Sequence, residues 1–261
     1  MHIPVTLAQT HILYGNVKAN VEHMREIAAD LPPGSLLLLP ELWSSSYDLD
    51  RSVIISRENE AALQQMAETA RRRRLFIGGS LLLEMNGDLV NSFNLADPDG
   101  AIIAQYQKIH LFRLMQEHEW MQPGNNPRVV DLLGIKVGLA ICYDLRFPEL
   151  FRYYAAQDCK LILVSAEWPI RRVAHWKVLL QARAIENQCF VAGVGNVGDT
   201  GGSVYGGSSL LVDPWGRILL EGSETDEQIL SAEIDPAIAD EFRQKIPALQ
   251  DRRTDLYTDW M

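Results

Sequence analysis

Residues 137–149 read Val137-Gly138-Leu139-Ala140-Ile141-Cys142-Tyr143-Asp144-Leu145-Arg146-Phe147-Pro148-Glu149. The small and branched apolar residues before Cys142 predict a buried strand. The end of the stretch is typical of a helix start, since proline fits the first turn and an acidic residue interacts well with the helix dipole. Cys142 therefore lies at a strand-to-helix junction, where α/β enzymes place their chemistry. A nearby helix N-terminus and a neighbouring cation would both favour the reactive thiolate.

The alternative is that Cys142 is a buried small side chain, the more frequent fate of a free cysteine. The chain has three cysteines, Cys142, Cys159 and Cys189, an odd number at wide spacing. This pattern favours free thiols in a reducing compartment over a disulfide framework. We expect Cys159 and Cys189 to be buried and inert, so the role of Cys142 depends on residues elsewhere in the chain.

Strands and helices alternate on both sides of this stretch, which predicts an α/β fold with one domain over residues 1–261. Strands are expected at 3–9, 36–39, 75–84, 89–96, 102–106, 128–132, 135–141, 161–165, 190–197, 208–212, 218–220 and 229–234. Helices are expected at 16–30, 58–73, 149–156, 173–187 and 236–245, where apolar residues recur at helical spacing. We also expect a mobile loop over 198–207 near the mouth of the site, and a polar tail over about 246–261 that covers the body or reaches a partner subunit.

The composition excludes several classes of partner. The net charge of −10 makes nucleic acid and anionic membranes poor partners. The one basic run, Arg71 to Arg74, ends a predicted helix, where cations complement the helix dipole. No signal peptide and no bilayer-spanning stretch is visible, so we expect a cytoplasmic protein.

Three residues whose side chains can take part in catalysis follow strands of the predicted sheet: Glu41, Lys108 and Cys142. A charge at the end of a buried strand is costly unless it is paired or used, so one shared site explains all three. A carboxylate accepts the thiol proton, a lysine stabilises an oxyanion, and a cysteine forms an acyl intermediate. This is the logic of the hydrolase triads with Glu and Lys in place of His.

At these residues the sequence resembles the nitrilase or carbon–nitrogen hydrolase superfamily. The matching segments are Leu39-Pro40-Glu41, Tyr106 to Phe112, Cys142 to Glu149 and Ala182 to Asn187, and the resemblance covers nearly the whole chain. It implies a four-layer α-β-β-α sandwich, usually paired with a second copy across a two-fold axis as a homodimer or larger oligomer. It also implies a Cys-Glu-Lys triad that uses neither a metal nor an organic cofactor.

The resemblance implies a role for each matching residue. Glu41 is expected to be the general base, Lys108 the oxyanion partner and Cys142 the nucleophile, with the backbone N–H of Tyr143 as second oxyanion donor. The family has a further glutamate near the lysine. Glu117 matches it best, and Glu119 is the competing choice.

The segments that follow the cysteine indicate a branch of the superfamily. Tyr143 to Glu149 resembles the ω-amidases. Leu42 to Leu49 and Ala166-Glu167-Trp168-Pro169 resemble the bacterial ω-amidases associated with methionine salvage, whose substrate would be 2-oxoglutaramate. Arg146 would then bind the remote carboxylate of the substrate, since guanidinium pairs with carboxylate through two parallel hydrogen bonds. Trp168 would form a wall of the pocket and shield the thioester.

Several alternatives stay open at this point. The enzyme could act as another amidase, an N-carbamoyl hydrolase, a nitrilase or an acyltransferase, and a scaffold that binds without turnover is the non-enzymatic alternative. Gly193 to Gly198 matches G-x-G-x-x-G, but no helix is expected after it, so a phosphate site is disfavoured. The histidines show no zinc-binding spacing. Arg183, Glu186 and Asn187 either support the site or form a salt-bridged helix face.

Overall fold

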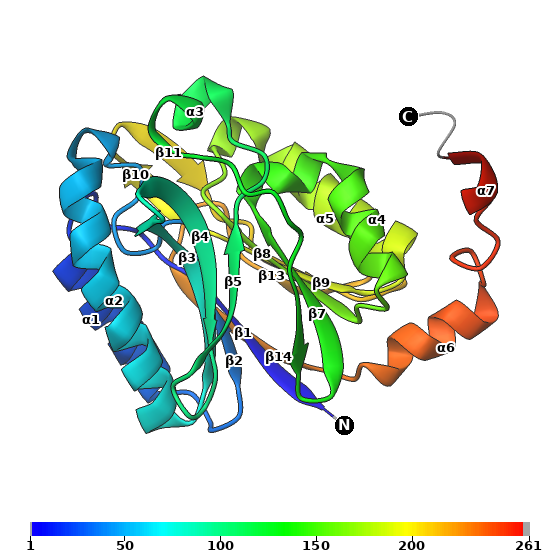
Figure 1. Cartoon of the computed structure of the whole chain (residues 1–261). Helices are drawn as coiled ribbons and strands as arrows, with labels where there is room; N and C mark the ends of the chain where they lie inside the picture. Colours follow the sequence, from blue (N-terminus) through cyan, green and yellow to red (C-terminus); the bar gives the residue numbers. More distant parts are fainter. Residues whose placement is uncertain (1, 258–261) are drawn as a thin grey trace.

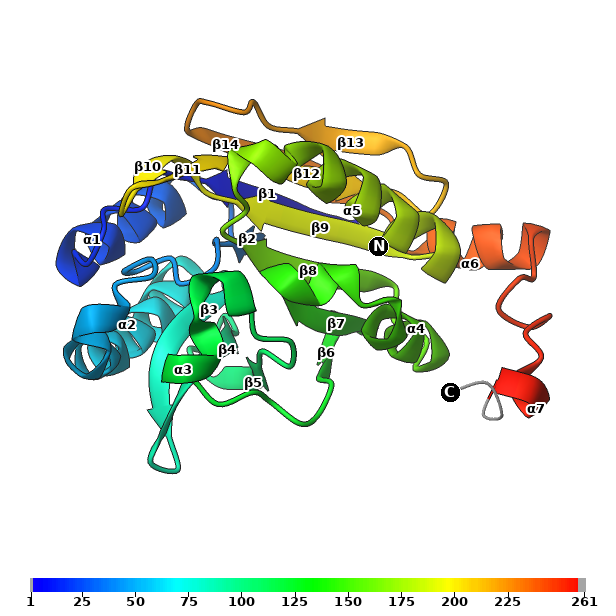
Figure 2. The ribbon, with the colours of Figure 1, turned by 90° about the horizontal axis from the view of Figure 1, so that it is seen from above.

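Two six-stranded sheets stack face to face, and helices cover the outer face of each one (Figures 1 and 2). The computed structural model describes residues 2–257. One outer layer contains α1 (Val17–Ala29) and α2 (Ser52–Arg73), and the other contains α4 (Pro148–Ala156) and α5 (Val173–Asn187). The architecture is thus the four-layer α-β-β-α sandwich expected from the sequence.

The first sheet has the strand order β14-β1-β2-β3-β4-β5. Its centre is parallel, since β1 pairs with β2 and β2 with β3 in parallel, and its remaining pairs are antiparallel. The strand bounds are β1 (Ile3–Gln9), β2 (Leu36–Leu38), β3 (Phe76–Met85), β4 (Asp88–Ala96), β5 (Ile102–Gln107) and β14 (Gln228–Ile234). All three residues of β2 are buried, as a central strand covered on both faces requires.

The second sheet has the order β13-β12-β9-β8-β7-β6, again with a parallel centre of β7, β8 and β9. Its strands are β6 (Val129–Leu132), β7 (Ile135–Ile141), β8 (Leu161–Ala166), β9 (Phe190–Gly195), β12 (Leu210–Val212) and β13 (Ile218–Glu221). The largest apolar cluster joins inner residues of both sheets, such as Leu7, Phe93, Leu139 and Leu163, which are fully buried. Burial of these side chains is the main force that holds the two sheets together.

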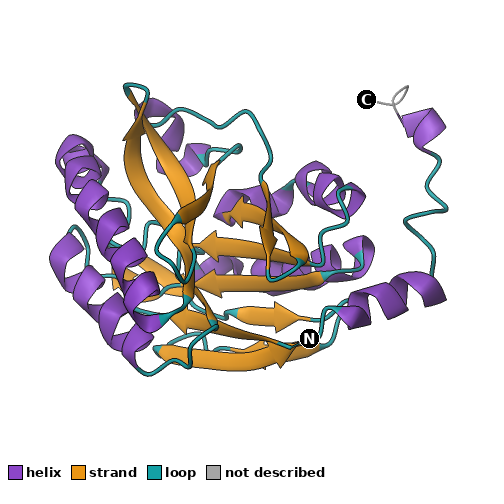
Figure 3. Ribbon diagram, turned by 60° about the horizontal axis from the view of Figure 1, so that its bottom comes forward, coloured by secondary structure: helices purple, strands orange, loops and turns teal. Residues whose placement is uncertain are grey.

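The chain places the carboxyl ends of β2, β5, β7 and β8 at one end of the sandwich. Strand β5 runs in the same direction as β3 because both are antiparallel to β4. The Ser165 hydroxyl, at the end of β8, donates to the Leu39 carbonyl oxygen just after β2, at 2.8 Å, and so joins the two sheets at this end. Residues that follow these four strands therefore lie close together although they are far apart in sequence (Figure 3).

Two of the expected boundaries are wrong, each for a physical reason. Residues 198–207 are not a loose loop, because β10 (Val197–Thr200) and β11 (Ser203–Gly206) form a hairpin. Its two-residue turn is Gly201-Gly202, both at positive φ, which is a favoured hairpin turn. Helix α2 begins six residues before the expected start, because the exposed Val53 and Ile54 interrupt the apolar spacing of its first turn.

The last described segment of the chain lies outside the sandwich. Helix α6 (Ala237–Lys245) and the short α7 (Thr254–Tyr257) lead away from the body beyond β14 (Figure 1). The expected tail over 246–261 lies in this segment, and its last four residues, 258–261, lie outside the described residues. Within residues 2–257, no helix has the length and apolar character needed to cross a membrane.

Candidate active site

Cys142 occupies a strained turn directly after β7. Its φ of +44° lies in the left-handed region, which is unfavourable for a residue with a side chain. Asp144 stabilises the turn, because its Oδ2 accepts hydrogen bonds from the Ile141 N–H at 2.9 Å and the Tyr106 hydroxyl at 2.8 Å. The strain is thus supported by a buried carboxylate, and the thiol is held at the end of the strand.

Two further side chains support the same turn. His110 donates its backbone N–H to Asp144 Oδ1 at 3.0 Å, and its ring nitrogen lies 2.8 Å from the same oxygen. Arg183 of α5 is buried and donates twice to the Leu145 carbonyl oxygen, at 2.8 and 3.2 Å. Arg183 also forms an ion pair with Glu186 at 2.7 Å. The segment therefore both supports the turn at Cys142 and forms a salt-bridged helix face.

Glu41 is fully buried and follows β2 within a tight loop. Its Oε1 accepts hydrogen bonds from the Lys108 ammonium at 2.7 Å, the Tyr47 hydroxyl at 2.7 Å and the Asn91 amide at 2.8 Å. Its Oε2 accepts the backbone N–H of Glu167 at 3.0 Å. Four donors thus fix the orientation of this carboxylate.

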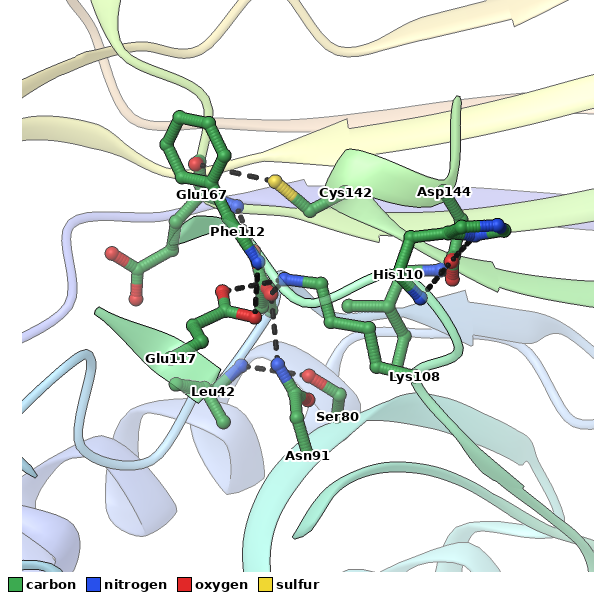
Figure 4. Close-up of polar contacts among 12 residues, drawn as sticks. Leu42, Ser80, Asn91, Lys108, His110, Phe112, Glu117, Cys142, Asp144 and Glu167 are labelled. Atoms are coloured by element: carbon green, nitrogen blue, oxygen red, sulfur yellow. Dashed lines mark hydrogen bonds and ion pairs between the residues drawn. The ribbon is translucent and has the colours of Figure 1, made fainter. Parts of the chain in front are cut away.

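Lys108 is paired with a second buried carboxylate, that of Glu117. The ammonium lies 2.6 Å from Glu117 Oε1, and the two side chains point toward one another in Figure 4. Glu117 Oε2 accepts the backbone N–H of Phe112 at 3.0 Å, which attaches the loop after β5 to the site. Glu119 is exposed on the other side of the short helix α3 (Glu117–Trp120), so Glu117 is the glutamate that faces the lysine.

The Cys142 thiol faces this acidic cluster from the second sheet. It lies 3.6 Å from the Glu167 carbonyl oxygen and interacts electrostatically with Glu41, Lys108 and Glu117. The structure therefore brings Glu41, Lys108, Cys142 and Glu117 together, as the sequence predicts.

A small pocket opens onto the thiol. Trp168 forms a buried wall of it, and the Arg146 guanidinium carbon lies 4.9 Å from the Trp168 ring centroid. The Tyr143 ring contacts Phe112, with 4.8 Å between ring centroids. The pocket is lined by Tyr47, Phe112, Met115, Cys142, Tyr143, Arg146, Glu167, Trp168, Pro169 and Arg172. Arg146 and Trp168 thus both line the space beside Cys142.

Residues 5–244 match the family model of carbon–nitrogen hydrolases. The chain belongs to the carbon–nitrogen hydrolase family. It is 39% identical to the 2-oxoglutaramate amidase of Bacillus subtilis (strain 168), with 97% of this chain and 98% of that protein covered.

Solved structures of the superfamily agree with this assignment. The fold matches XC1258 from Xanthomonas campestris, a CN-hydrolase superfamily protein with an arsenic adduct in its active site, at a TM-score of 0.92 and 31% identity over 97% of this chain and 98% of that one. A mutant amidase from Nesterenkonia sp. AN1, with acrylamide added to its active-site cysteine, matches at a TM-score of 0.89 and 27% identity over 99% and 100%. The chain is accordingly a cysteine-dependent hydrolase of carbon–nitrogen bonds.

The charges in the site of this hydrolase stabilise one another. Burial alone would lower the pKa of Lys108, but the Glu117 and Glu41 carboxylates outweigh burial and raise it, so the lysine stays charged. Burial and the Glu41 carboxylate raise the pKa of Glu117, and Lys108 opposes them. The Tyr47 hydroxyl has one proton for two carboxylates, at 2.7 Å from Glu41 and 2.6 Å from Glu117.

The surroundings of Cys142 in this hydrolase include groups that oppose the thiolate as well as a cation that favours it. Burial raises the pKa of the Cys142 thiol well above its ordinary value, and the Glu41 carboxylate raises it further, whereas Lys108 lowers it. The thiol therefore keeps its proton at neutral pH until an adjacent base removes it.

Sequence reasoning missed three residues of the site. Tyr47 and Asn91 both bind the Glu41 carboxylate, and Glu167 contacts Glu41 and Cys142 through its backbone. Only Glu167 has a signal of position in the sequence, since it comes two residues after a predicted strand, as Glu41 does. Within residues 2–257, no group of three or more His, Cys, Asp or Glu side chains has a geometry that could hold a metal ion.

We predict that Glu117→Gln lowers kcat roughly 100-fold, a magnitude typical of losing one preorganised electrostatic contact. The amide cannot balance the charge of Lys108, which then pairs with Glu41 alone. Glu119→Gln is the matched control, because Glu119 is exposed on the same short helix. Steady-state ammonia release measures both variants, and equal activities would contradict the role of Glu117.

Proposed function

We propose that this hydrolase cleaves the terminal amide of a small dicarboxylic keto acid of the 2-oxoglutaramate type, releasing ammonia. One observation supports this proposal most directly: two arginines, Arg146 and Arg172, line the pocket of Cys142. Within residues 2–257, neither of them forms an ion pair with a carboxylate, although the chain has a net charge of −10. Two unpaired guanidinium groups beside a nucleophile suit a substrate with a carboxylate remote from its amide.

The walls of the pocket hold both arginines in place. Trp168 stacks on Arg146, and its indole N–H donates to the Arg172 carbonyl oxygen at 2.8 Å. The Arg172 guanidinium carbon lies 5.4 Å from the ring centroid of Phe112. Aromatic contacts of this kind restrict a guanidinium without neutralising it. Arg146 Nη2 also lies 3.4 Å from His175 Nδ1, a contact that adds no negative charge, so both arginines can still bind an anion. The similarity of the chain to the 2-oxoglutaramate amidase of Bacillus subtilis supports the same class of substrate.

The first half of the proposed reaction forms a thioester. Glu41 accepts the proton of the Cys142 thiol while the sulfur attacks the amide carbon. Lys108 and the Tyr143 backbone N–H stabilise the oxyanion of the tetrahedral intermediate. The carbon–nitrogen bond then breaks, and the leaving nitrogen takes the proton from Glu41 and departs as ammonia.

In the second half of the proposed reaction, water hydrolyses the thioester, and Glu41 again accepts and then returns a proton. Glu41 removes a proton from water, and the oxygen attacks the thioester carbon at the same oxyanion position. The carbon–sulfur bond breaks, the free carboxylic acid forms, and the proton returns from Glu41 to the Cys142 sulfur. Trp168 covers the thioester in this scheme, and no group outside the chain takes part except water.

We expect ammonia release from 2-oxoglutaramate that is abolished by Cys142→Ala. Glutamine, a carbamoyl amino acid and a simple nitrile serve as competing substrates in the same assay. Turnover of one of these in place of the keto amide would assign the site to another amidase, an N-carbamoyl hydrolase or a nitrilase. A protein that turns over none of them but passes an acyl group to an added amine would be a transferase, and one that does neither would be a binding scaffold.

We predict that Arg146→Lys and Arg172→Gln each raise KM for 2-oxoglutaramate about 10- to 100-fold, the loss expected for one charge-assisted contact of 1.5–3 kcal/mol. A neutral amide of similar length should lose much less in both variants. Arg171→Gln is the matched control, because Arg171 precedes Arg172 and is exposed. Equal losses with anionic and neutral amides would exclude carboxylate binding by these arginines.

We propose in addition that the protein acts as a cytoplasmic homodimer. Its three free cysteines suit a reducing compartment. Tyr153 on α4 and Ile185 on α5 expose apolar side chains at 42% and 48%, and α6 and α7 extend beyond the same side of the sandwich (Figure 2). This outer face is the surface that we expect a second copy to cover, with the tail at its edge.

Light scattering of the purified chain should give twice the monomer mass of 29.4 kDa. Combining Tyr153→Asp with Ile185→Asp should shift the protein toward the monomer, because burying two new charges is costly. The same double change at the exposed Val53 and Ile54 of α2 serves as control. A monomeric wild type would contradict this proposal.

A further inference from the structure

Glu167 is a buried acid for which the proposed reaction has no chemical use. It follows β8 directly and is 1% exposed. Its backbone N–H donates to Glu41 Oε2 at 3.0 Å, and its carbonyl oxygen lies 3.6 Å from the Cys142 sulfur. One peptide segment thus contacts both the proposed base and the proposed nucleophile, and its placement decides how these two groups meet.

The side chain of Glu167 lies on the other side of this segment. Figure 4 shows its carboxyl group pointing away from Cys142 and Lys108. Glu167 Oε2 accepts the Ser46 hydroxyl at 2.9 Å, and Ser46 belongs to the loop that begins at Glu41. Ser46 has a φ of +56°, so this contact helps to hold a strained part of that loop.

The carboxyl group also interacts with the β10–β11 hairpin. The Tyr205 hydroxyl of β11 and the Asn196 amide, just before β10, both interact with it. The backbone contributes as well, since Tyr205 forms a bridge with Pro169 and the Gly206 N–H donates to the Trp168 carbonyl oxygen at 3.2 Å. Glu167 is therefore the side chain that joins the Glu41 loop, the end of β8 and the hairpin.

The surroundings of this carboxyl group favour its neutral form. The titratable groups that interact with it are the Glu41 carboxylate and the phenols of Tyr14, Tyr47 and Tyr205. Among residues 2–257, no cation forms an ion pair with it. Burial raises the pKa of Glu167 well above its ordinary value and the charge of Glu41 raises it further, which outweighs the hydrogen bonds from Ser46, Tyr205 and Asn196 that lower it.

A protonated acid also satisfies a neighbouring group. Both amide atoms of Asn196 are buried without a well-aligned hydrogen-bond partner among the described residues, and so is Glu167 Oε1. A protonated carboxyl group and an amide are complementary, because each presents one donor and one acceptor to the other. An ionised carboxylate would leave the Asn196 oxygen without a donor.

We propose that Glu167 is a positioning residue that acts as a neutral acid. It joins the Glu41 loop to the β10–β11 hairpin, and thereby holds its own peptide N–H on Glu41 and its carbonyl oxygen beside the Cys142 sulfur. The inference rests on the proposed roles of Glu41 and Cys142, and it does not depend on which amide is the substrate.

The test compares Glu167→Gln with Glu167→Met in the full-length protein. The glutamine keeps one donor and one acceptor without a charge, so kcat should stay near the wild-type value. The methionine fills the space without hydrogen bonds, and kcat should fall about 100-fold at a nearly unchanged KM, as a misplacement of about 1 Å produces. Thermal unfolding reports whether each variant is folded.

A pH profile gives a readout that a merely structural role would not change. As the pH rises, ionisation of Glu167 removes its one donor and places a second negative charge near Glu41, which should lower kcat in the wild type. Glu167→Gln cannot ionise, so this alkaline decline should be weaker or absent. An unchanged decline in the glutamine variant, or equal losses in the Gln and Met variants, would overturn the neutral-acid role.

A substrate-independent measurement separates this inference from the proposed function. Alkylation of Cys142 by iodoacetamide should proceed at near wild-type rate in Glu167→Gln and be at least several-fold altered in Glu167→Met. This result stands even if 2-oxoglutaramate is not turned over. Identical alkylation in wild type and Glu167→Met would show that Glu167 does not position the thiol, and would reject the proposal.

Discussion

The site depends on one buried cation, Lys108, held between two buried carboxylates. An ammonium without partners at this depth would lose its proton, and either carboxylate alone would gain one. Together with Tyr47 and Asn91, the three ionic groups satisfy one another through contacts of 2.6 to 2.8 Å. Glu41 comes from the end of β2, Lys108 from the end of β5, and Glu117 from the loop beyond it. The first sheet must therefore be complete before the cluster exists.

Several residues with a strained backbone conformation lie around this cluster. Leu42, Ser46, Gln116 and Cys142 all have positive φ although none of them is glycine. Each lies within five residues of Glu41 or directly beside Glu117, or is itself the proposed nucleophile. Such conformations cost free energy of order 1–3 kcal/mol each and persist only where surrounding contacts enforce them. The hydrogen bonds of Ser46 to Glu167, of Leu42 to Ser80 and of Ile141 to Asp144 are contacts of this kind.

The fold and the central ionic group could be predicted because both follow from local rules. Apolar runs such as Leu36 to Leu39 predict buried strands, and polar residues directly after such strands predict a shared edge. Tyr47 and Asn91 act through pairings that only the folded chain creates, so local patterns do not reveal them. The protonation state of the thiol depends on the tertiary structure for a related reason, since burial of Cys142 and the charge of Glu41 outweigh Lys108.

The charge balance of the Lys108 cluster has a consequence for product release. One ammonium faces two carboxylates, so the cluster of Lys108, Glu41 and Glu117 itself carries an excess of negative charge. The amide of the proposed substrate is neutral there and meets no repulsion. Hydrolysis turns it into a carboxylic acid, which ionises beside Glu41 and Glu117 and makes the product a dianion. Because like charges repel in a site of low dielectric, we expect the new carboxylate to bind beside Glu41 and Glu117 less well than the neutral amide did, which favours release of the product.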